Sequence, residues 1–308
     1  MNRRTFLGGA AAYSASLSAA PPQRHSIIDS HIHLFDVSRP QGVPWPPKTS
    51  PIYKSSLPEG YQKLAEPYGI TGAIAIECSP WPADNEWVLD IARDAPIIVG
   101  TIGNLEPGGS DFGKHLERLH KNPLFRGIRY GNLWGRNLDS EISKPEFVAG
   151  LKLLADAGLV LDTANPTPAL MRAAVQVTDR VPNLRIVLDH MPELKLPDDP
   201  AARKACDADL RSLAARPNVF AKISGIVRRV DGRVPLDLNF YRDRLDHIWE
   251  IFGPDRLLFG SDWPNSAQWA SYPQIFQLSQ DFLSSKDAAS VEKIHWKNSL
   301  HAYRWTRR

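Results

Sequence analysis

The chain has 308 residues, of which 43% are hydrophobic and 23% are charged, with 37 basic side chains against 34 acidic ones. These proportions exclude a disordered chain, which combines few apolar residues with a large net charge. Two cysteines cannot build a disulfide scaffold, and a formal net charge of +3 is too small to indicate binding to nucleic acid or anionic lipid. A globular protein remains, and its length suits one α/β barrel of ~250 residues or two smaller domains.

Residues 1–20 have the pattern of an export signal. Arg3 and Arg4 stand before Thr5, and an uncharged stretch rich in Gly, Ala and Ser follows. A basic start, a short apolar region and small residues near its end are typical of a cleaved signal peptide, and the paired arginines indicate the twin-arginine route. We therefore expect export to the periplasm. The stretch is too short and too weakly apolar to span a bilayer, so we expect no stable membrane insertion.

Eight short apolar runs follow, each four to eight residues long and bounded by Gly, Pro, Asn or Asp. Continuous apolar runs indicate strands that are buried on both faces, as in a parallel sheet covered by helices. Helix-like stretches alternate with these runs along the chain. The predicted strands span residues 27–33, 72–77, 97–102, 127–130, 159–163, 184–190, 219–224 and 257–262, and the predicted helices span 58–68, 84–95, 112–121, 144–157, 168–180, 201–215 and 239–252.

The repeated order of strand and helix allows a closed (β/α)8 barrel or an open doubly wound sheet. The count of eight strands favours the barrel. No Gly-x-Gly-x-x-Gly follows any predicted strand, which weakens the dinucleotide-binding version of the open sheet. We therefore predict fold class α/β, with a single (β/α)8 TIM-barrel domain at residues 24–308, and no nucleotide or organic cofactor.

Polar side chains stand at the ends of several predicted strands. His31 and His33 close the first run two residues apart, so both imidazoles lie on one face of the strand. His190 ends the sixth run and Asp262 ends the eighth. Because the C-terminal ends of barrel strands surround the active site, we expect these side chains to meet there. A single carboxylate at a strand end can instead cap the next helix, so it is the combination that indicates chemistry.

Five segments together resemble the amidohydrolase superfamily. The motifs are specific when taken together, and they are similar to those of the TIM-barrel lactonases that act on sugar lactones and dicarboxylate lactones. The resemblance covers nearly the whole chain after the signal segment. The segments read IDSHIHLFD at residues 28–36, FRGIR at 125–129, IVLDH at 186–190, KISG at 222–225, and GPDR followed by FGSDWP within 253–264.

The resemblance implies that His31, His33 and His190 surround the substrate carbonyl or a metal ion. It also implies that Asp262 activates water. Lactone hydrolysis needs a nucleophilic water, a proton acceptor beside it, and positive or donor groups where the oxyanion develops. The imidazoles either polarise the carbonyl directly or hold one Zn2+, which would polarise it and lower the pKa of bound water to ~7.

The sequence departs from relatives that hold two metal ions. Those relatives bridge the ions through a carboxylated lysine or a glutamate on strand four or five. Strand four here offers Arg129, and strand five offers Asp162. We therefore do not expect a binuclear centre. Glu77 or Asp162 is the candidate to complete a site for a single ion.

Aromatic and basic side chains near the strand ends suggest the substrate. Tryptophan rings stack on the C–H faces of sugars and on planar rings, and arginine binds carboxylates in bidentate fashion. We therefore expect a small-molecule lactone or carboxylate substrate. Each tryptophan can equally pack its own loop, and Lys222 can equally form a buried ion pair. The candidate substrate contacts are Trp45, Trp81, Trp134, Trp263, Arg129 and Lys222.

Three functions are compatible with these residues. The first is an exported hydrolase that opens a sugar-derived or carboxylated lactone, with Asp262 as the base. The second is a Zn-dependent decarboxylase or amide hydrolase, whose strand-end residues would be similar. The third is an exported carbohydrate-binding barrel without catalysis, which would not need all four of the strand-end residues.

Overall fold

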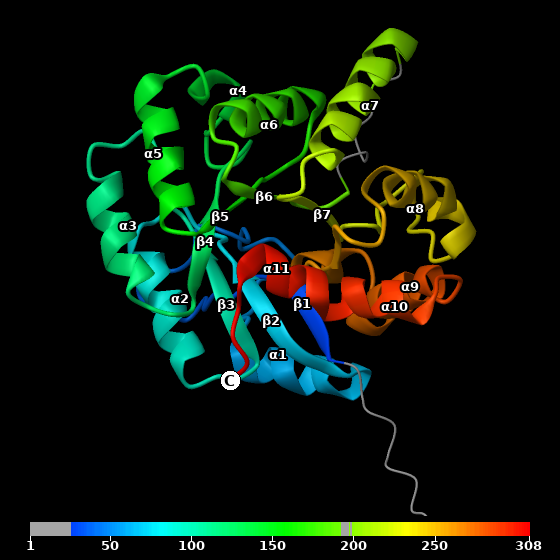
Figure 1. Cartoon of the computed structure of the whole chain (residues 1–308). Coiled ribbons are helices and arrows are strands. Elements are labelled where there is room, and N and C mark those ends of the chain that lie inside the picture. The colour runs from blue at the N-terminus through cyan, green and yellow to red at the C-terminus, as the bar shows by residue number, and fades with distance from the viewer. Residues whose placement is uncertain (1–25, 192–196, 198) are drawn as a thin grey trace, which may run out of the picture.

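Eight parallel strands form the centre of the molecule. The structure is a computed structural model, and it describes residues 26–191, 197 and 199–308. The strands follow one another around a barrel in chain order, and helices surround them (Figure 1). This is the predicted single-domain (β/α)8 TIM barrel. The predicted export signal at residues 1–20 lies outside the described residues.

All eight predicted strands are confirmed, with shifts at their ends. The strands carrying the polar ends stop early, so His33, His190 and Asp262 stand just beyond the last strand residue. Their side chains are therefore held by the turns that leave the barrel. The strands are β1 (Ile27–Ile32), β2 (Ile70–Ile76), β3 (Ile98–Gly103), β4 (Phe125–Arg129), β5 (Val160–Asp162), β6 (Arg185–Leu188), β7 (Val219–Ile223) and β8 (Leu257–Phe259).

Helices cover the outside of the barrel, and the seven predicted ones are confirmed. Proline stands in the first turn of α1, α5, α6, α7 and α9. Backbone N–H groups in the first turn have no acceptor within the helix, so proline, which lacks an N–H, costs no hydrogen bond there. The helices after β8 were not predicted. The helices are α1 (Pro58–Ala65), α2 (Ala83–Arg93), α3 (Phe112–His120), α4 (Leu138–Glu141), α5 (Pro145–Asp156), α6 (Pro168–Arg180), α7 (Pro200–Ala214), α8 (Leu238–Phe252), α9 (Tyr272–Leu283), α10 (Ala288–Glu292) and α11 (Asn298–Tyr303), with short turns η1 (Glu66–Tyr68), η3 (Asn265–Gln268) and η4 (Lys293–Lys297).

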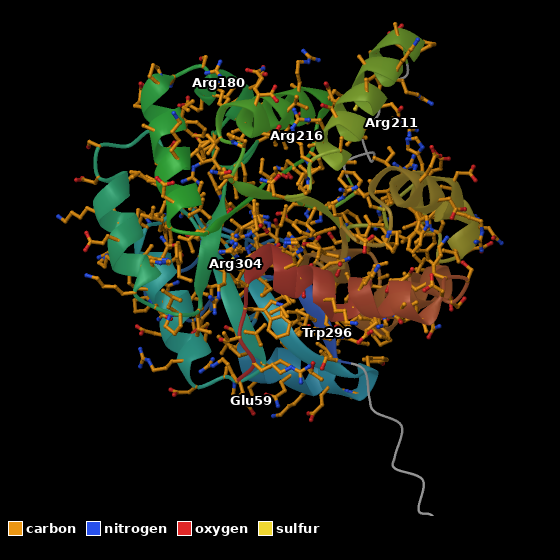
Figure 2. The ribbon with its side chains drawn as sticks, in the orientation of Figure 1. Glu59, Arg180, Arg211, Arg216, Trp296 and Arg304 are labelled. Carbon is orange, nitrogen blue, oxygen red and sulfur yellow. The ribbon has the colours of Figure 1, made fainter. Side chains whose placement is uncertain are left out.

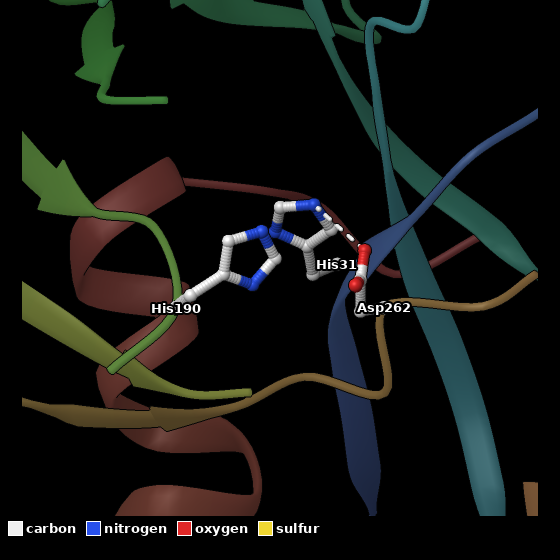
Figure 3. Close-up of side chains that lie close together, drawn as sticks. All are labelled: His31, His190 and Asp262. Carbon is white, nitrogen blue, oxygen red and sulfur yellow. Dashed lines mark ion pairs between the residues drawn. The ribbon is translucent and has the colours of Figure 1, made fainter. Parts of the chain in front are cut away.

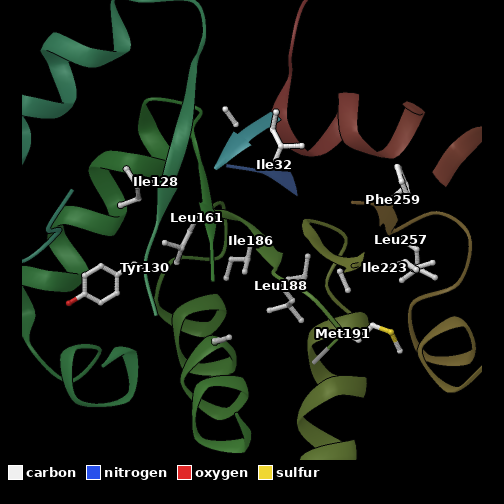
Figure 4. Packing of buried hydrophobic residues seen from close by; sticks show 14 of the residues in the cluster. Ile32, Ile128, Tyr130, Leu161, Ile186, Leu188, Met191, Ile223, Leu257 and Phe259 are labelled. Atoms are coloured by element: carbon white, nitrogen blue, oxygen red, sulfur yellow. The ribbon is translucent and has the colours of Figure 1, made fainter. Parts of the chain in front are cut away.

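Two apolar clusters hold the barrel together. The larger one lies between the strands and the helices, where Ile128, Leu161 and Ile186 are among the buried residues (Figure 4). The smaller one contains alternate residues of the strands together with Tyr303 and Trp305 from the C-terminal segment. Because neighbouring residues of a strand point to opposite faces, the smaller cluster fills the barrel interior. α11, red in Figure 1, lies across the strands and contributes to that interior.

The surface of the outer helices is charged. Arg180 of α6 and Arg211 of α7 are exposed and point away from the barrel (Figure 2). Among the residues that the structure describes, no helix has the length and apolar character needed to cross a membrane.

The barrel closes where β1 meets the segment after β8. The backbone N–H of His33 donates to the carbonyl of Trp263 at 2.7 Å, and the N–H of Asp262 donates to the carbonyl of His31 at 2.9 Å. Gly260 permits this approach, because a Cβ atom there would lie 2.9 Å from the Cβ of His31. The seam therefore joins the two segments that carry His31 and Asp262.

Asp29 stabilises this seam. It is fully buried, and its Oδ1 accepts the N–H of Ser261 at 2.8 Å and the N–H of His31 at 3.2 Å. Its Oδ2 accepts the hydroxyls of Tyr61 at 2.8 Å and Tyr272 at 3.3 Å. Burial raises the pKa of Asp29, and the hydrogen bonds from Ser261 oppose that shift. One carboxyl group thus connects β1, the segment after β8, α1 and α9.

Candidate active site

The structure brings the four strand-end residues together at one end of the barrel. Figure 3 shows His31, His190 and Asp262 side by side. The ring centres of His31 and His190 lie 4.6 Å apart, and Oδ1 of Asp262 lies 3.6 Å from Nε2 of His31. His33, His190 and Asp262 line a cavity of about 240 Å³. His31 is fully buried beside them.

His33 is oriented by the backbone of β2. Its Nδ1 lies 3.0 Å from the carbonyl oxygen of Ile76, which can only accept, so Nδ1 carries a proton. Its Nε2 faces Nε2 of His31 at 3.3 Å and Oδ1 of Asp262 at 3.2 Å. A neutral His33 would then present a lone pair to a carboxylate oxygen. The contact is favourable when His33 is protonated or when a cation lies between the two acceptors.

His190 is held on the opposite side of the cavity. Its Nδ1 lies 3.0 Å from Oγ of Ser224, which follows β7. Gly225 lies directly against the ring, because a Cβ atom there would be 3.1 Å from Nδ1. Gly225 also has a φ of +61°, a conformation that glycine adopts without strain. The other ring nitrogen of His190 is left to face the cavity.

The cavity is lined by residues with unusual backbone conformations. Trp134, Asn165, His190 and Asp262 all have positive φ, between 51° and 60°. Among the described residues only Asp231 and Arg304 share this property without being glycine. Such conformations cost of order 1–3 kcal/mol each and gather at functional sites. Their concentration around one cavity makes it the candidate functional site.

Burial and neighbouring charges set the ionisation of the site. Burial alone would raise the pKa of Asp262, but the charge of His190 and the hydrogen bond with His33 outweigh it and hold that pKa below its ordinary value. Burial lowers the pKa of His31 well below its ordinary value and lowers that of His190. The site therefore presents an ionised carboxylate beside neutral imidazoles.

The same residues fit a metal ion. One ligand atom from each of His31, His190 and Asp262 lies within 4.8 Å of the others. Imidazole nitrogen and carboxylate oxygen are ligands that Zn2+ prefers in catalytic sites with three protein ligands. Within the described ranges, Glu77 and Asp162 do not belong to this group, so neither completes it. Each is instead held by a cation of the barrel.

Arg129 connects Glu77 to the cavity. Its Nε donates to Oε1 of Glu77 at 2.8 Å, and its Nη2 donates to the Glu77 carbonyl at 2.8 Å. Its Nη1 reaches Oδ2 of Asp189 at 3.3 Å. Oε2 of Glu77 accepts the indole N–H of Trp134 at 3.0 Å. Arg129 still lines the cavity, and three of its five N–H groups have protein partners.

Lys222 lies in a buried layer of charges and does not line the cavity. Its ammonium donates to Asp162 at 2.7 Å and to Asp189 at 2.6 Å, and it lies 3.2 Å from Nδ1 of His31. It is fully buried. The hydroxyl of Tyr303 donates to Asp162 at 2.9 Å, and burial raises the pKa of Asp162 to about 7 against the attraction of Lys222. Lys222 forms ion pairs with Asp162 and Asp189 and does not line the cavity, so it is a buried ion-pair residue and not a substrate contact from this position.

The four candidate tryptophans divide into two pairs. Trp45 and Trp134 line the cavity, and the ring of Trp45 lies 5.5 Å from that of His33. Trp263 packs on Tyr61 at 5.2 Å, and neither it nor Trp81 is among the lining residues. The structure adds lining residues that the sequence analysis missed, namely Cys78, Leu133, Asn165 and Asn265. Their one sequence signal is a position shortly after a predicted strand.

Comparisons with known proteins identify a family and relatives that match most of the chain. The family model described as Amidohydrolase matches residues 28–305. The chain is 30% identical over 240 residues to an L-fucono-1,5-lactonase of Burkholderia ambifaria, covering 78% of this chain and 80% of the relative. It is 22% identical to an L-rhamnono-gamma-lactonase of Scheffersomyces stipitis, covering 91% of this chain and 99% of the relative.

A solved structure shares the fold. The crystal structure of an amidohydrolase from Burkholderia multivorans with bound zinc superposes with a TM-score of 0.79 at 24% identity. The match covers 91% of this chain and 99% of that chain. The eight-stranded barrel is therefore common to both over nearly their full lengths.

Proposed function

The chain belongs to the amidohydrolase family, and from this premise we propose that it is a hydrolase that opens a lactone ring with water. The observation that carries the proposal is the contact of the Asp262 carboxylate with His31 and His33 at the wall of a cavity. Water attack on an ester carbonyl requires a carboxylate to accept a proton and donor groups beside the carbonyl oxygen, and Asp262 and the imidazoles supply these groups. The lactonase names of two relatives support the choice of substrate class.

Asp262 acts as the base. Its Oδ2 accepts the side-chain N–H of Asn265 at 2.8 Å, which leaves Oδ1 toward the histidines. The carboxylate accepts a proton from water while the water oxygen bonds to the lactone carbonyl carbon. His190 donates from Nε2 to the carbonyl oxygen, with the Ser224 hydroxyl donating to Nδ1. The bond from the carbonyl carbon to the ring oxygen then breaks, and Asp262 returns its proton to that oxygen.

His31, His190 and Asp262 are also the residues that would hold a metal ion, and we propose zinc. When bound, the ion supplies the positive charge that polarises the carbonyl and lowers the pKa of water to ~7. Lowered pKa values keep His31 and His190 in the neutral form that a metal ligand requires. Nε2 of His33 lies 3.2 Å from Oδ1 of Asp262, a contact that is favourable when His33 is protonated or when a cation lies between the two atoms.

The substrate is a sugar-derived or carboxylated lactone. Trp45 and Trp134 supply aromatic rings at the cavity, and C–H faces of a sugar ring stack on such surfaces. Arg129 keeps N–H groups that can donate to a hydroxyl or carboxylate of the substrate. Glu77 fixes both Arg129 and Trp134, so it positions substrate contacts without touching the reaction centre.

Replacing Asp262 by asparagine tests the proposal. Asp262→Asn keeps the shape of the side chain and removes the proton acceptor. We expect kcat/KM on a panel of aldonolactones, followed with a pH indicator, to fall at least ~100-fold. Asp231→Asn is the matched control, because Asp231 is exposed and also has a positive φ. Unchanged ring opening by Asp262→Asn would contradict the role of Asp262 as base.

We further propose that residues 1–20 direct export by the twin-arginine route. The support is the pair Arg3 and Arg4 ahead of an uncharged, weakly apolar stretch. Changing both arginines to lysine keeps the charge but removes the guanidinium groups. The variant should accumulate in the cytoplasm while the unchanged chain reaches the periplasm, as measured by cell fractionation. Equal export of both chains would be evidence against this route.

A further inference from the structure

A second hollow adjoins the cavity at the barrel mouth. It has a volume of about 190 Å³. Asn165, His190, Asp262 and Asn265 line both spaces, so the two meet at the proposed reaction centre. A molecule whose carbonyl lies between His190 and Asp262 therefore has one side toward each hollow.

The walls of the two hollows differ in chemistry. The first contains the Arg129 guanidinium and the indole of Trp134, whose N–H is bound to Glu77. The second adds Ile226, Val227, Ile275 and Trp269 to the shared residues, and Asp262 is the only ionised group among its lining residues. Of its two serine hydroxyls, that of Ser261 already accepts the backbone N–H of Trp263 at 3.1 Å. Ile226, Val227 and Ile275 offer no side-chain hydrogen-bond partner, so this part of the wall suits an apolar group, whereas the polar side chains are Ser261, Ser266 and the four that both hollows share.

Trp269 gives this hollow an exposed aromatic surface. It is 40% exposed, whereas Ile226, Val227 and Ile275 are 5% exposed or less. The guanidinium of Arg229 lies 5.8 Å from its ring centre. The indole ring lines the hollow together with the buried aliphatic side chains of Ile226, Val227 and Ile275, and the four together form an apolar surface against which an apolar group can pack.

We propose that the second hollow binds an apolar alkyl or aryl substituent of the lactone that the enzyme opens. This inference rests on the proposed lactonase function and narrows its substrate class. The substrate then has a polar ring side, which faces Arg129 and Trp134, and an apolar arm, which packs on Trp269, Val227 and Ile226. The arm belongs to the same molecule as the ring, because both hollows include His190 and Asp262.

Paired lactones test the inference. The pair is a six-membered lactone without a substituent and the same ring with a butyl group on the carbon next to the ring oxygen. A methylene group in an apolar pocket changes kcat/KM by ~10-fold or more, so we expect at least ~10-fold preference for the butyl lactone. In Trp269→Ala the ratio of the two kcat/KM values should fall to about one tenth of its value in the unchanged chain. Phe240→Ala is the matched control, because Phe240 is 46% exposed and lies outside both hollows.

Binding of inert analogues separates the two proposals. Lactams with the same ring and the same substituent are titrated by intrinsic tryptophan fluorescence. The butyl lactam should bind more tightly than the unsubstituted lactam, and Trp269→Ala should abolish this difference. If this result is obtained and no lactone is opened, the apolar hollow is supported and the proposed lactonase function is wrong. Ring opening with no preference for the butyl group, unaltered by Trp269→Ala, overturns the inference and leaves the function standing.

Discussion

At the scale of single residues, the site combines backbone strain with a shared carboxylate. His190 and Asp262 both have a φ of 60°. Non-glycine residues hold such conformations only where surrounding contacts compensate, and here the ring of His190 packs against Gly225 and Asp262 bonds to Asn265. The strain turns both side chains toward the cavity. For His31 and His33, the two-residue period of a strand is enough to put both side chains on the same face.

The proposed zinc site predicts that His190 is needed to hold the ion. His190→Ala removes one of its three proposed ligands, so we expect zinc affinity to fall by more than ~100-fold, a larger loss than that caused by removing an outer hydrogen-bond partner. Elemental analysis of protein purified without chelators and a chelator competition measure this. His120→Ala, which alters an exposed histidine of α3, should keep the metal content of the unchanged chain. Retention of zinc by His190→Ala would exclude His190 as a ligand.

The identity of the site residues was readable from the sequence, but the direction of several side chains was not. His31, His33, His190 and Asp262 follow apolar runs, and this position alone brings them to one rim. Trp81 and Trp134 both follow predicted strands in the same way, but of these two only Trp134 lines the cavity. The difference arises because Glu77 binds the indole of Trp134, a contact between residues 57 positions apart. Loop conformation decides such contacts, and it has no short-range signature.

At the scale of secondary-structure elements, α11 is coupled to the floor of the site. The hydroxyl of Tyr303 donates to Asp162, Asp162 binds Lys222, and Lys222 contacts His31. Tyr303 and Trp305 also belong to the apolar cluster inside the barrel. The final helix therefore contributes to the core of the molecule, and its residues support the charged layer beneath His31.

Tyr303→Phe isolates this coupling. The change removes a hydrogen bond to a buried carboxylate and keeps the ring. Hydrogen bonds to charged groups contribute ~1.5–3 kcal/mol, so we expect the free energy of unfolding in urea to fall by about that amount. Tyr53→Phe, at a half-buried tyrosine of the loop after β1, should change it far less. A stability equal to that of the unchanged chain would show that Asp162 gains nothing from Tyr303.

At the scale of the whole molecule, one carboxyl group joins the first strand to the segment after the last. Asp29 accepts hydrogen bonds from Ser261, Tyr61 and Tyr272 as well as from the backbone of His31. The seam places His31 and Asp262 next to each other. Stability and the geometry of the site therefore depend on the same contact.

Asp29→Ala should lower both the stability of the fold and the activity of the site. Each buried donor that loses its partner costs ~1–3 kcal/mol, and the Ser261 amide cannot rotate to find another acceptor. We expect the free energy of unfolding to fall by at least ~3 kcal/mol and kcat to fall with it. Asp29→Asn, which keeps an acceptor for Ser261, should lose less of each. Equal losses in the two variants would show that volume, and not hydrogen bonding, holds the seam.

The barrel follows from local sequence, whereas the side-chain contacts that hold its closing seam do not. Eight apolar runs predict eight strands because each run is buried on both faces. α9 was missed even though Ser271 and Gln274 form a capping box at its start, a signal that short sequence patterns do carry. The contact of Asp29 with Ser261 joins residues 232 positions apart and that of Tyr303 with Asp162 joins residues 141 apart, so no local sequence pattern predicts either.

The chain of contacts from Tyr303 to His31 also has a consequence for folding. His31 lies in the first strand and Tyr303 in the last helix, so these contacts join residues that a ribosome synthesises far apart in time. Asp162 and Lys222 are fully buried when α11 is in place. We therefore expect the charged layer beneath His31 to reach its final arrangement only after α11 has been translated and has packed against the barrel.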